Sequence, residues 1–218
     1  MASWGAVFDW DGVIIDSSAQ HEESWRRLAE EEGLELPADS FKRGFGMKNE
    51  KIIPELLGWT SDPAEVARLS LKKEALYRRV VQETGIEPLP GVKELLAQLQ
   101  RVSVPRVIGS STHRLNVTSI LELLGLEEYF DAIVSAEDVS DGKPNPQVFL
   151  LSAKRIGMPP HRCVVFEDTP VGIRAGRAAG MKVIAVAATH PVGALLGCDK
   201  IVSRLDEINV TELSSWFD

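Results

Sequence analysis

The 218-residue sequence contains few cysteines and few aromatic residues: two cysteines, and 6% phenylalanine, tryptophan and tyrosine together. Cys163 opens an apolar stretch and Cys198 lies in a loop-like one. Neither belongs to a Cys-x-x-Cys pattern or is paired with histidine, so nothing indicates a thiolate metal site or a disulfide framework. We expect both cysteines to be packing residues or idle thiols.

Long apolar runs are also scarce, and the 24 basic residues are outnumbered by 32 acidic ones. The longest apolar runs have the length of a strand, far short of the roughly 20 residues that span a bilayer. The N-terminus has no charged and apolar leader. We therefore expect a cytoplasmic protein with no membrane partner. The formal net charge of −8 provides no concentrated basic surface for a phosphate backbone, which disfavours nucleic acid as a partner.

The apolar content of 44% is sufficient for a hydrophobic core. A chain of 218 residues exceeds the usual size of a single domain, which favours one domain with a smaller insertion.

Two carboxylates follow the first apolar run of the chain. They belong to Asp9-Trp10-Asp11-Gly12, where the two aspartates are two positions apart. Side chains at this spacing point to the same face of an extended strand, and Gly12 lets the chain turn without a Cβ penalty. The pair is typical of magnesium-assisted phosphoryl transfer. An ordinary polar turn after a strand explains this tetrapeptide equally well, so the rest of the chain must decide.

The region after residue 16 has a helical pattern. A helix is predicted from Ser17 to about Gly33, with Ser17 and Gln20 as a capping box. Further helices are predicted from Glu50 to Leu57 and from Pro63 to Thr84, separated from the first by a linker. No segment of this region has a good strand pattern.

Short apolar strands and helices alternate from Pro88 to the C-terminus. This alternation is typical of a parallel, doubly wound α/β sheet. The sequence therefore predicts a core of residues 1–16 and 88–218, with a helical cap domain of residues 17–87 inserted after the first strand.

Three more polar clusters follow later in the chain. Ser110 ends an apolar strand, Lys143 lies in a loop stiffened by two prolines, and Glu167-Asp168 follows a second apolar strand. The carboxyl ends of parallel strands share one edge of a sheet, so we expect these clusters to meet the first pair. Each also has an ordinary explanation: Ser110 and Glu167-Asp168 as helix N-caps, and Lys143 as a solvated lysine.

These side chains suit the hydrolysis of a phosphate ester. Asp9 is the candidate nucleophile, which would form an aspartyl-phosphate. Asp11 would protonate the leaving oxygen and then take a proton from water. Lys143 would neutralise charge on the transferring phosphoryl group. The hydroxyl of Ser110 and the amides after it would hold phosphate oxygens.

Bringing carboxylates and a phosphate together requires positive charge. Magnesium prefers hard oxygen ligands and uses the substrate phosphate as one of them. Asp168 is the strongest remote ligand candidate, and Glu167 is the next.

Together the four clusters resemble the four motifs of the haloacid dehalogenase (HAD) superfamily, and the resemblance covers nearly the whole chain. It implies a Rossmann-like α/β core with an α-helical cap, and a Mg²⁺-dependent phosphohydrolase. Aspartate at position 11 argues against the dehalogenase and phosphonatase branches, which lack it. The residues implied are the catalytic Asp9, Asp11, Ser110 and Lys143, the metal ligands Asp9, Asp11 (through its backbone carbonyl), Glu167 and Asp168, and the substrate-binding Ser111 and Thr112.

The position of the cap resembles the subclass that contains β-phosphoglucomutase and many sugar-phosphate phosphatases. His21, with Trp25 at matching spacing, and Lys73, which precedes Tyr77 in a Lys-x-x-x-Tyr pattern, fit this subclass. The resemblance implies that His21 and Lys73 bind a phosphorylated, sugar-like substrate. The alternatives are a boundary histidine packed near Trp25 and a lysine on a solvated helix face.

The cap loop departs from the mutase pattern. Gly46 and Asn49 are predicted to contact substrate, but the mutase has a basic residue where Asn49 stands and a lysine where Phe45 stands. Each missing charge-assisted hydrogen bond to a second phosphate is worth about 1.5–3 kcal/mol. A small register shift would let Lys48 or Lys42 compensate.

We therefore favour a phosphatase acting on a small phosphorylated metabolite, with a phosphomutase as the alternative. A non-catalytic HAD-fold binding protein is a remote alternative, because such proteins are expected to lose Asp9, Asp11 or Lys143. The expected assembly is a monomer or weak homodimer.

Overall fold

The computed structural model describes residues 3–44 and 47–218. The chain divides into two units, one formed by Met1–Asp16 and Glu87–Asp218 and the other by Ser17–Ile86. We refer to the first as the core and to the second as the insertion, and describe each by itself.

The core is built on a six-stranded sheet in which every paired strand is parallel to its neighbour. The strand order is β3-β2-β1-β4-β5-β6. Most strand residues are apolar and buried, as expected for a parallel sheet that is covered on both faces. The strands are β1 (Gly5–Phe8), β2 (Arg106–Gly109), β3 (Ala132–Val134), β4 (Cys163–Glu167), β5 (Lys182–Val186) and β6 (Lys200–Val202).

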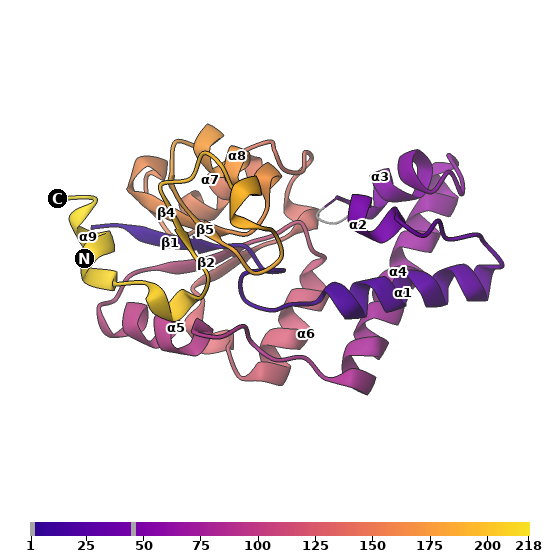
Figure 1. Ribbon diagram of the computed structural model, residues 1–218, viewed down its shortest axis with the longest axis horizontal. Helices are drawn as coiled ribbons and strands as arrows, with labels where there is room; N and C mark the ends of the chain where they lie inside the picture. Colours follow the sequence, from indigo (N-terminus) through magenta and orange to yellow (C-terminus); the bar gives the residue numbers. More distant parts are fainter. Residues whose placement is uncertain (1–2, 45–46) are drawn as a thin grey trace. The chain divides into compact units, whose positions relative to one another are not determined.

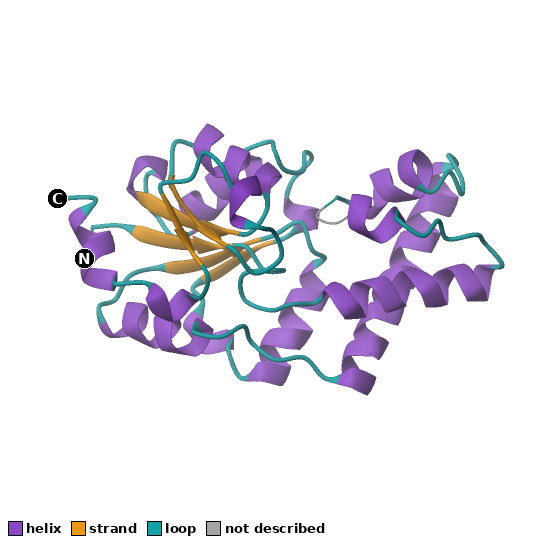
Figure 2. Ribbon diagram, in the orientation of Figure 1, coloured by secondary structure: helices purple, strands orange, loops and turns teal. Residues whose placement is uncertain are grey.

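Helices lie on both faces of this sheet. Figure 1 shows α5 and α6 on one face and α7 and α8 on the other, and Figure 2 shows the strands enclosed between them. This arrangement confirms the predicted doubly wound α/β fold. The helices of the core are α5 (Val92–Arg101), α6 (Arg114–Leu124), α7 (Gln147–Arg155), α8 (Pro170–Ala178) and α9 (Val210–Ser215).

The register of the sheet aligns the carboxyl ends of the central strands. Phe8, the last residue of β1, lies opposite Ile108 of β2 and Phe166 of β4. The chain order reverses at β1, since β2 and β3 lie on one side of it and β4 and β5 on the other. Ligands of open α/β sheets bind outside the carboxyl ends of strands at such a reversal point. The residues that follow β1, β2 and β4 therefore lie at the edge where a ligand is expected.

The insertion contains helices and loops and no strand among its described residues (Figure 2). A short helix, α2, forms where the sequence suggested a linker. The elements are α1 (Ser18–Glu32), α2 (Ser40–Gly44), α3 (Asn49–Lys51), the π-helical turn η1 (Ile52–Leu56) and α4 (Pro63–Thr84).

The predicted capping box at the start of α1 is wrong. The side chain of Ser17 makes no capping hydrogen bond. The amide of Gln20 instead donates to the carbonyl oxygen of Gly85 at 3.0 Å. The Gln20 side chain is thus hydrogen-bonded to a residue at the end of α4, 65 positions away, and not to Ser17.

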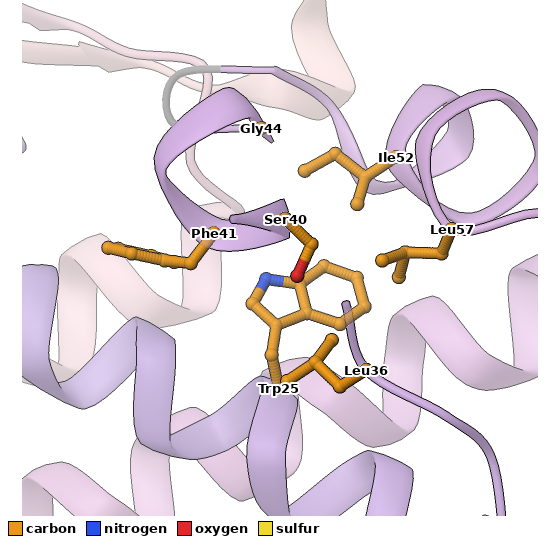
Figure 3. A pocket seen from close by; sticks show the side chains of 7 residues that line it. All are labelled: Trp25, Leu36, Ser40, Phe41, Gly44, Ile52 and Leu57. Atoms are coloured by element: carbon orange, nitrogen blue, oxygen red, sulfur yellow. The ribbon is translucent and has the colours of Figure 1, made fainter. Parts of the chain in front are cut away.

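The insertion has its own apolar cluster around Trp25, Leu28, Ile53 and Leu69. Beside Trp25 is a small hollow that is partly open to solvent (Figure 3). Its lining contains no charged or acid–base side chain, so it has no means of transferring a phosphoryl group. The lining residues are Trp25, Leu36, Ser40, Phe41, Gly44, Ile52 and Leu57.

Both cysteines are free thiols. Within residues 3–44 and 47–218, no helix combines the length and the apolar character needed to cross a membrane.

Candidate active site

Asp9 lies directly after β1 and is almost completely buried. Its Oδ1 atom accepts a hydrogen bond from the Trp10 amide at 2.8 Å, and its Oδ2 atom lies 2.7 Å from Lys143 Nζ. Burial raises the pKa of the Asp9 carboxyl well above its ordinary value, Lys143 opposes this shift, and the charges of Glu167 and Asp168 add to it. The carboxylate is thus held by an amide and an ammonium group in a site that disfavours further negative charge.

The Lys143 ammonium is shared between two carboxylates. It lies 2.7 Å from Asp9 Oδ2 and 2.7 Å from Glu167 Oε1, and its side chain is only 4% exposed. Burial alone would lower the pKa of Lys143, but the charges of Asp9 and Glu167 and the hydrogen bonds to both raise it above its ordinary value. The ammonium also lies 4.9 Å from the centre of the Phe149 ring. Lys143 is therefore a fixed, buried cation, and its interpretation as a solvated surface lysine is wrong.

Glu167 is the last residue of β4 and is fully buried. Its Oε1 accepts from Lys143, and its Oε2 accepts from the amide and hydroxyl of Thr169 at 2.6 and 2.9 Å. Burial would raise the pKa of Glu167, but Lys143 holds it below its ordinary value. A Cβ atom on Gly172 would lie 1.6 Å from Glu167 Oε1. Gly172 in α8 therefore makes room for this carboxylate.

Asp168 follows Glu167 and is also fully buried, so the interpretation of this pair as a solvated helix cap is wrong. The cap of α8 is Thr169, whose hydroxyl accepts from the Gly172 amide. The Oδ2 atom of Asp168 accepts from the hydroxyl of Thr189, and its Oδ1 atom is buried without a hydrogen-bond partner in the described structure. Burial and the charge of Glu167 raise the pKa of Asp168 to about 8, against the Thr189 hydrogen bond.

Asp9, Glu167 and Asp168 each place a carboxylate oxygen within 4.8 Å of the others. Hard oxygen ligands of this kind suit Mg²⁺, and an orphaned buried oxygen is expected where a cation is to be bound. The residues present therefore fit the expected metal. Asp168 fits it best, because its Oδ1 atom has no partner among the described residues. Glu167 fits it least, because its two oxygens already accept from Lys143 and twice from Thr169.

The side chain of Asp11 lies beside the loop that follows β2. Its Oδ2 accepts a hydrogen bond from the Thr112 hydroxyl. Thr112 is held in turn by its amide, which donates to Ser110 Oγ at 3.0 Å, and by its carbonyl, which accepts from Ala136. Ser110 is buried and donates its amide to the Val134 carbonyl. The structure thus brings Asp11, Ser110 and Thr112 together, with the half-buried Ser111 between the last two.

The predicted substrate residues His21, Asn49 and Lys73 all belong to the insertion, and Gly46 and the neighbouring Phe45 lie outside the described residues. The Nδ1 atom of His21 lies 2.7 Å from Lys73 Nζ, and the His21 ring is stacked on Tyr77 with centroids 3.9 Å apart. Lys73 is 3% exposed, so the solvated helix face proposed as its alternative is wrong.

Asn49 and Lys73 meet at Glu74. The Asn49 amide donates to Glu74 Oε1 at 2.6 Å and to Ser70 Oγ at 3.1 Å, and Lys73 Nζ lies 3.0 Å from the same glutamate oxygen. All four side chains are buried. The insertion therefore contains a buried polar cluster in which the lysine charge is balanced by a carboxylate.

The contacting residues that were not predicted from the sequence include Thr169, Thr189 and Glu74. Thr169 directly follows the acidic pair, so its position was a usable signal. Thr189 lies 21 residues beyond Asp168 in a loop whose path has no periodic pattern. Glu74 is adjacent to Lys73 but resembles the other acidic residues of a helix.

The raised pKa of Asp168 predicts how the magnesium-free protein responds to pH. Between about 4 and about 8 the folded carboxyl holds a proton that the unfolded chain has released, so the folded state binds more protons. Stability should then fall as the pH rises, by about 1.4 kcal/mol per pH unit for one such group. Urea unfolding in EDTA at pH 5, 6 and 7 measures this slope, which should be shallower in Asp168→Asn. An equal slope in both proteins would contradict the assignment.

The fold and this edge of carboxylates around a buried lysine define a hydrolase of phosphoryl-transfer type. A family model for haloacid dehalogenase-like hydrolases matches residues 5–180, so the chain belongs to the haloacid dehalogenase-like hydrolase family. The predicted resemblance is confirmed.

The chain is similar to several named enzymes of this family. It is 35% identical to the chloroplastic 5-amino-6-(5-phospho-D-ribitylamino)uracil phosphatase of Arabidopsis thaliana, covering 98% of this chain and 58% of that relative. It is 34% identical to fructose-1-phosphate phosphatase YqaB of Escherichia coli, over 84% of this chain and 95% of that one. It is 30% identical to β-phosphoglucomutase of Bacillus subtilis, over 94% of this chain and 91% of that one.

A solved structure of a HAD hydrolase from Entamoeba histolytica superimposes with a TM-score of 0.88 at 29% identity, covering 100% of this chain and 99% of that one. The fold and relatives together make the chain an enzyme of the phosphatase and phosphomutase group of this family.

Proposed function

We propose that this enzyme is a magnesium-dependent phosphatase that hydrolyses a small phosphorylated metabolite, a sugar or sugar alcohol phosphate, through an aspartyl-phosphate on Asp9. The observation that carries the proposal is the Asp9 carboxylate at the sheet edge, with Oδ2 2.7 Å from the buried Lys143 ammonium and within the acidic cluster of Glu167 and Asp168.

In the first half-reaction a carboxylate oxygen of Asp9 attacks phosphorus and forms an acyl phosphate. The bond from phosphorus to the ester oxygen breaks, and Asp11 gives its proton to that oxygen, so the alcohol leaves neutral. In the second half-reaction water attacks the same phosphorus, Asp11 takes its proton, and inorganic phosphate leaves with Asp9 restored. The hydroxyl of Thr112 holds Asp11 in one orientation for both proton transfers.

Lys143 and Glu167 act as one unit. Lys143 offsets the negative charge of Asp9 and of an incoming phosphoryl group, and such fixed charges cost no reorganisation during the reaction. Glu167, held by Thr169, fixes the lysine in place. When bound, Mg²⁺ supplies further positive charge for the carboxylates and the phosphate. Asp9 and Asp168 would hold it, and the backbone carbonyl of Asp11 would be the third protein ligand. Glu167 is a less favoured candidate ligand.

The insertion favours a phosphatase over a mutase. A mutase must hold the second phosphate of a bisphosphate, which calls for unbalanced positive charge. The buried Lys73 is paired with Glu74, and Asn49 is neutral and bonded to the same glutamate. We keep His21, Gly46, Asn49, Lys73, Ser111 and Thr112 as proposed substrate contacts.

The test is phosphate release from a panel of phosphomonoesters with and without Mg²⁺. The names of the relatives suggest fructose 1-phosphate, hexitol phosphates and 5-amino-6-(5-phospho-D-ribitylamino)uracil as first members. Magnesium-dependent release from one of these is the expected result. β-Glucose 1-phosphate is assayed alongside, and its conversion to glucose 6-phosphate without free phosphate would instead establish the mutase.

A further inference from the structure

The loop after β5 brings a threonine hydroxyl to the acidic cluster. β5 pairs with β4 so that Ala185 lies opposite Glu167, and the chain therefore leaves β5 at the edge where Asp168 follows β4. Thr189, three residues beyond β5, donates its hydroxyl proton to Asp168 Oδ2. A residue with no role in the mechanism above thus contacts a proposed metal ligand directly.

The two oxygens of Asp168 have different surroundings. Oδ2 accepts from Thr189, whereas Oδ1 is buried without a partner among the described residues. The backbone of Gly12, with φ of 78°, closes one side of the carboxylate: a Cβ atom there would lie 2.0 Å from Oδ2 and 2.3 Å from Cγ. The carboxylate is therefore confined by Gly12 and anchored by Thr189, which leaves Oδ1 as the oxygen available to a cation.

His190 fixes the hydroxyl that anchors Asp168. Its Nδ1 atom lies 2.9 Å from Thr189 Oγ1. An ionised carboxylate only accepts hydrogen bonds, so when Asp168 is ionised to bind a cation the threonine proton points to Oδ2, and the imidazole tautomer that fits this arrangement donates from Nδ1 to Oγ1. A hydroxyl with one donated and one accepted bond has a single favoured orientation.

We infer that Thr189 is a positioning residue whose hydroxyl orients Asp168 so that Oδ1 binds Mg²⁺. This inference rests on the proposed function. Loss of a hydrogen-bond partner of a metal-ligating group typically costs about 10–100-fold in metal affinity. The inference depends on the proposed metal and not on the identity of the substrate.

The experiment measures Mg²⁺ affinity by isothermal titration calorimetry on the full chain, with magnesium chloride as the probe. Thr189→Val keeps the shape of the side chain and removes the hydroxyl, and we expect it to weaken Mg²⁺ binding about 10–100-fold. Thr189→Ser keeps the hydroxyl and should bind within about threefold of the wild type, as expected when the hydroxyl carries the effect. Thr118→Val is the matched control, because the Thr118 hydroxyl lies in α6 and donates to the backbone carbonyls of Arg114 and Leu115.

The inference would be overturned if Thr189→Val bound Mg²⁺ with the affinity of the wild type. It would also be overturned if Thr189→Ser bound Mg²⁺ as weakly as Thr189→Val. Unfolding temperatures in EDTA check that each variant is folded, and Thr189→Ala replaces the valine variant if that one does not fold.

Phosphate release is measured separately. A wild type that binds Mg²⁺ but hydrolyses no ester of the panel would refute the proposed function while the Thr189 comparison still stands. A wild type that binds no Mg²⁺ would overturn both.

Discussion

Asp9→Asn should abolish phosphate release while leaving the fold intact. Asparagine has nearly the same shape as aspartate and can still accept the hydrogen bond from the Trp10 amide, but its amide is not a nucleophile. Removing a catalytic nucleophile costs several orders of magnitude in kcat, and we expect a loss of at least about 10³-fold. The measurement is kcat for the best ester of the panel, with the unfolding midpoint in urea recorded on the same preparations.

Asp206→Asn is a suitable control for this variant, because Asp206 is an exposed residue of the core paired with Arg204 and should be silent in both assays. Retained turnover in Asp9→Asn would refute the assignment of the nucleophile.

Lys143→Met should damage both activity and stability. Without the ammonium, the carboxylates of Asp9 and Glu167 stay buried with no cation between them. Breaking a buried ion pair from one side typically costs about 3–5 kcal/mol, and the loss of positive charge at the reacting phosphate should lower kcat by about 10³-fold.

The stability loss of Lys143→Met should depend on pH. Without the lysine, the pKa of Asp9 rises further above its ordinary value and that of Glu167 is no longer held below it, so the folded state binds more protons and gains stability as the pH falls. Urea unfolding at pH 5 and pH 8 should therefore show the larger deficit at pH 8.

Lys182→Met is the matched control for Lys143→Met. Lys182 also lies over the aromatic ring of Trp216 and pairs with the carboxylate of Asp199. Unlike that of Lys143, however, its side chain is 44% exposed. Exposed pairs contribute about 1 kcal/mol or less. A Lys143→Met deficit as small as that of Lys182→Met, or one that is equal at both pH values, would contradict the role of Lys143 as the buried counter-ion.

The strand-end residues could be predicted because a parallel sheet converts sequence position into spatial position. Asp9 follows β1, Ser110 follows β2, Glu167 is the last residue of β4 and Asp168 follows it. Adjacent parallel strands with aligned carboxyl ends bring such residues to one edge however far apart they lie in the chain. The same alternation of strands and helices predicted the doubly wound fold.

Helix lengths were also predictable where the local pattern was strong. The helix predicted from Pro63 to Thr84 is observed with the same limits, and Asp62 caps it by accepting from the Ala64 amide. The capping box at Ser17 and Gln20 failed because Gln20 found a partner at Gly85. Local capping patterns do not exclude a distant group that competes for the same side chain.

By itself, the sequence determined that the core is a parallel sheet and which polar residues follow its strands. It therefore also determined which acidic residues lie around Lys143. Only the tertiary structure decided which neighbours these acidic residues have. Thr112 donates to Asp11 and Thr189 donates to Asp168, and the absence of a side chain at Gly172 leaves space for Glu167. The physical reason is that periodicity encodes which face or edge a residue occupies. Hydrogen bonds between loops up to 101 residues apart depend instead on the path of each loop, which the packing of the whole core sets.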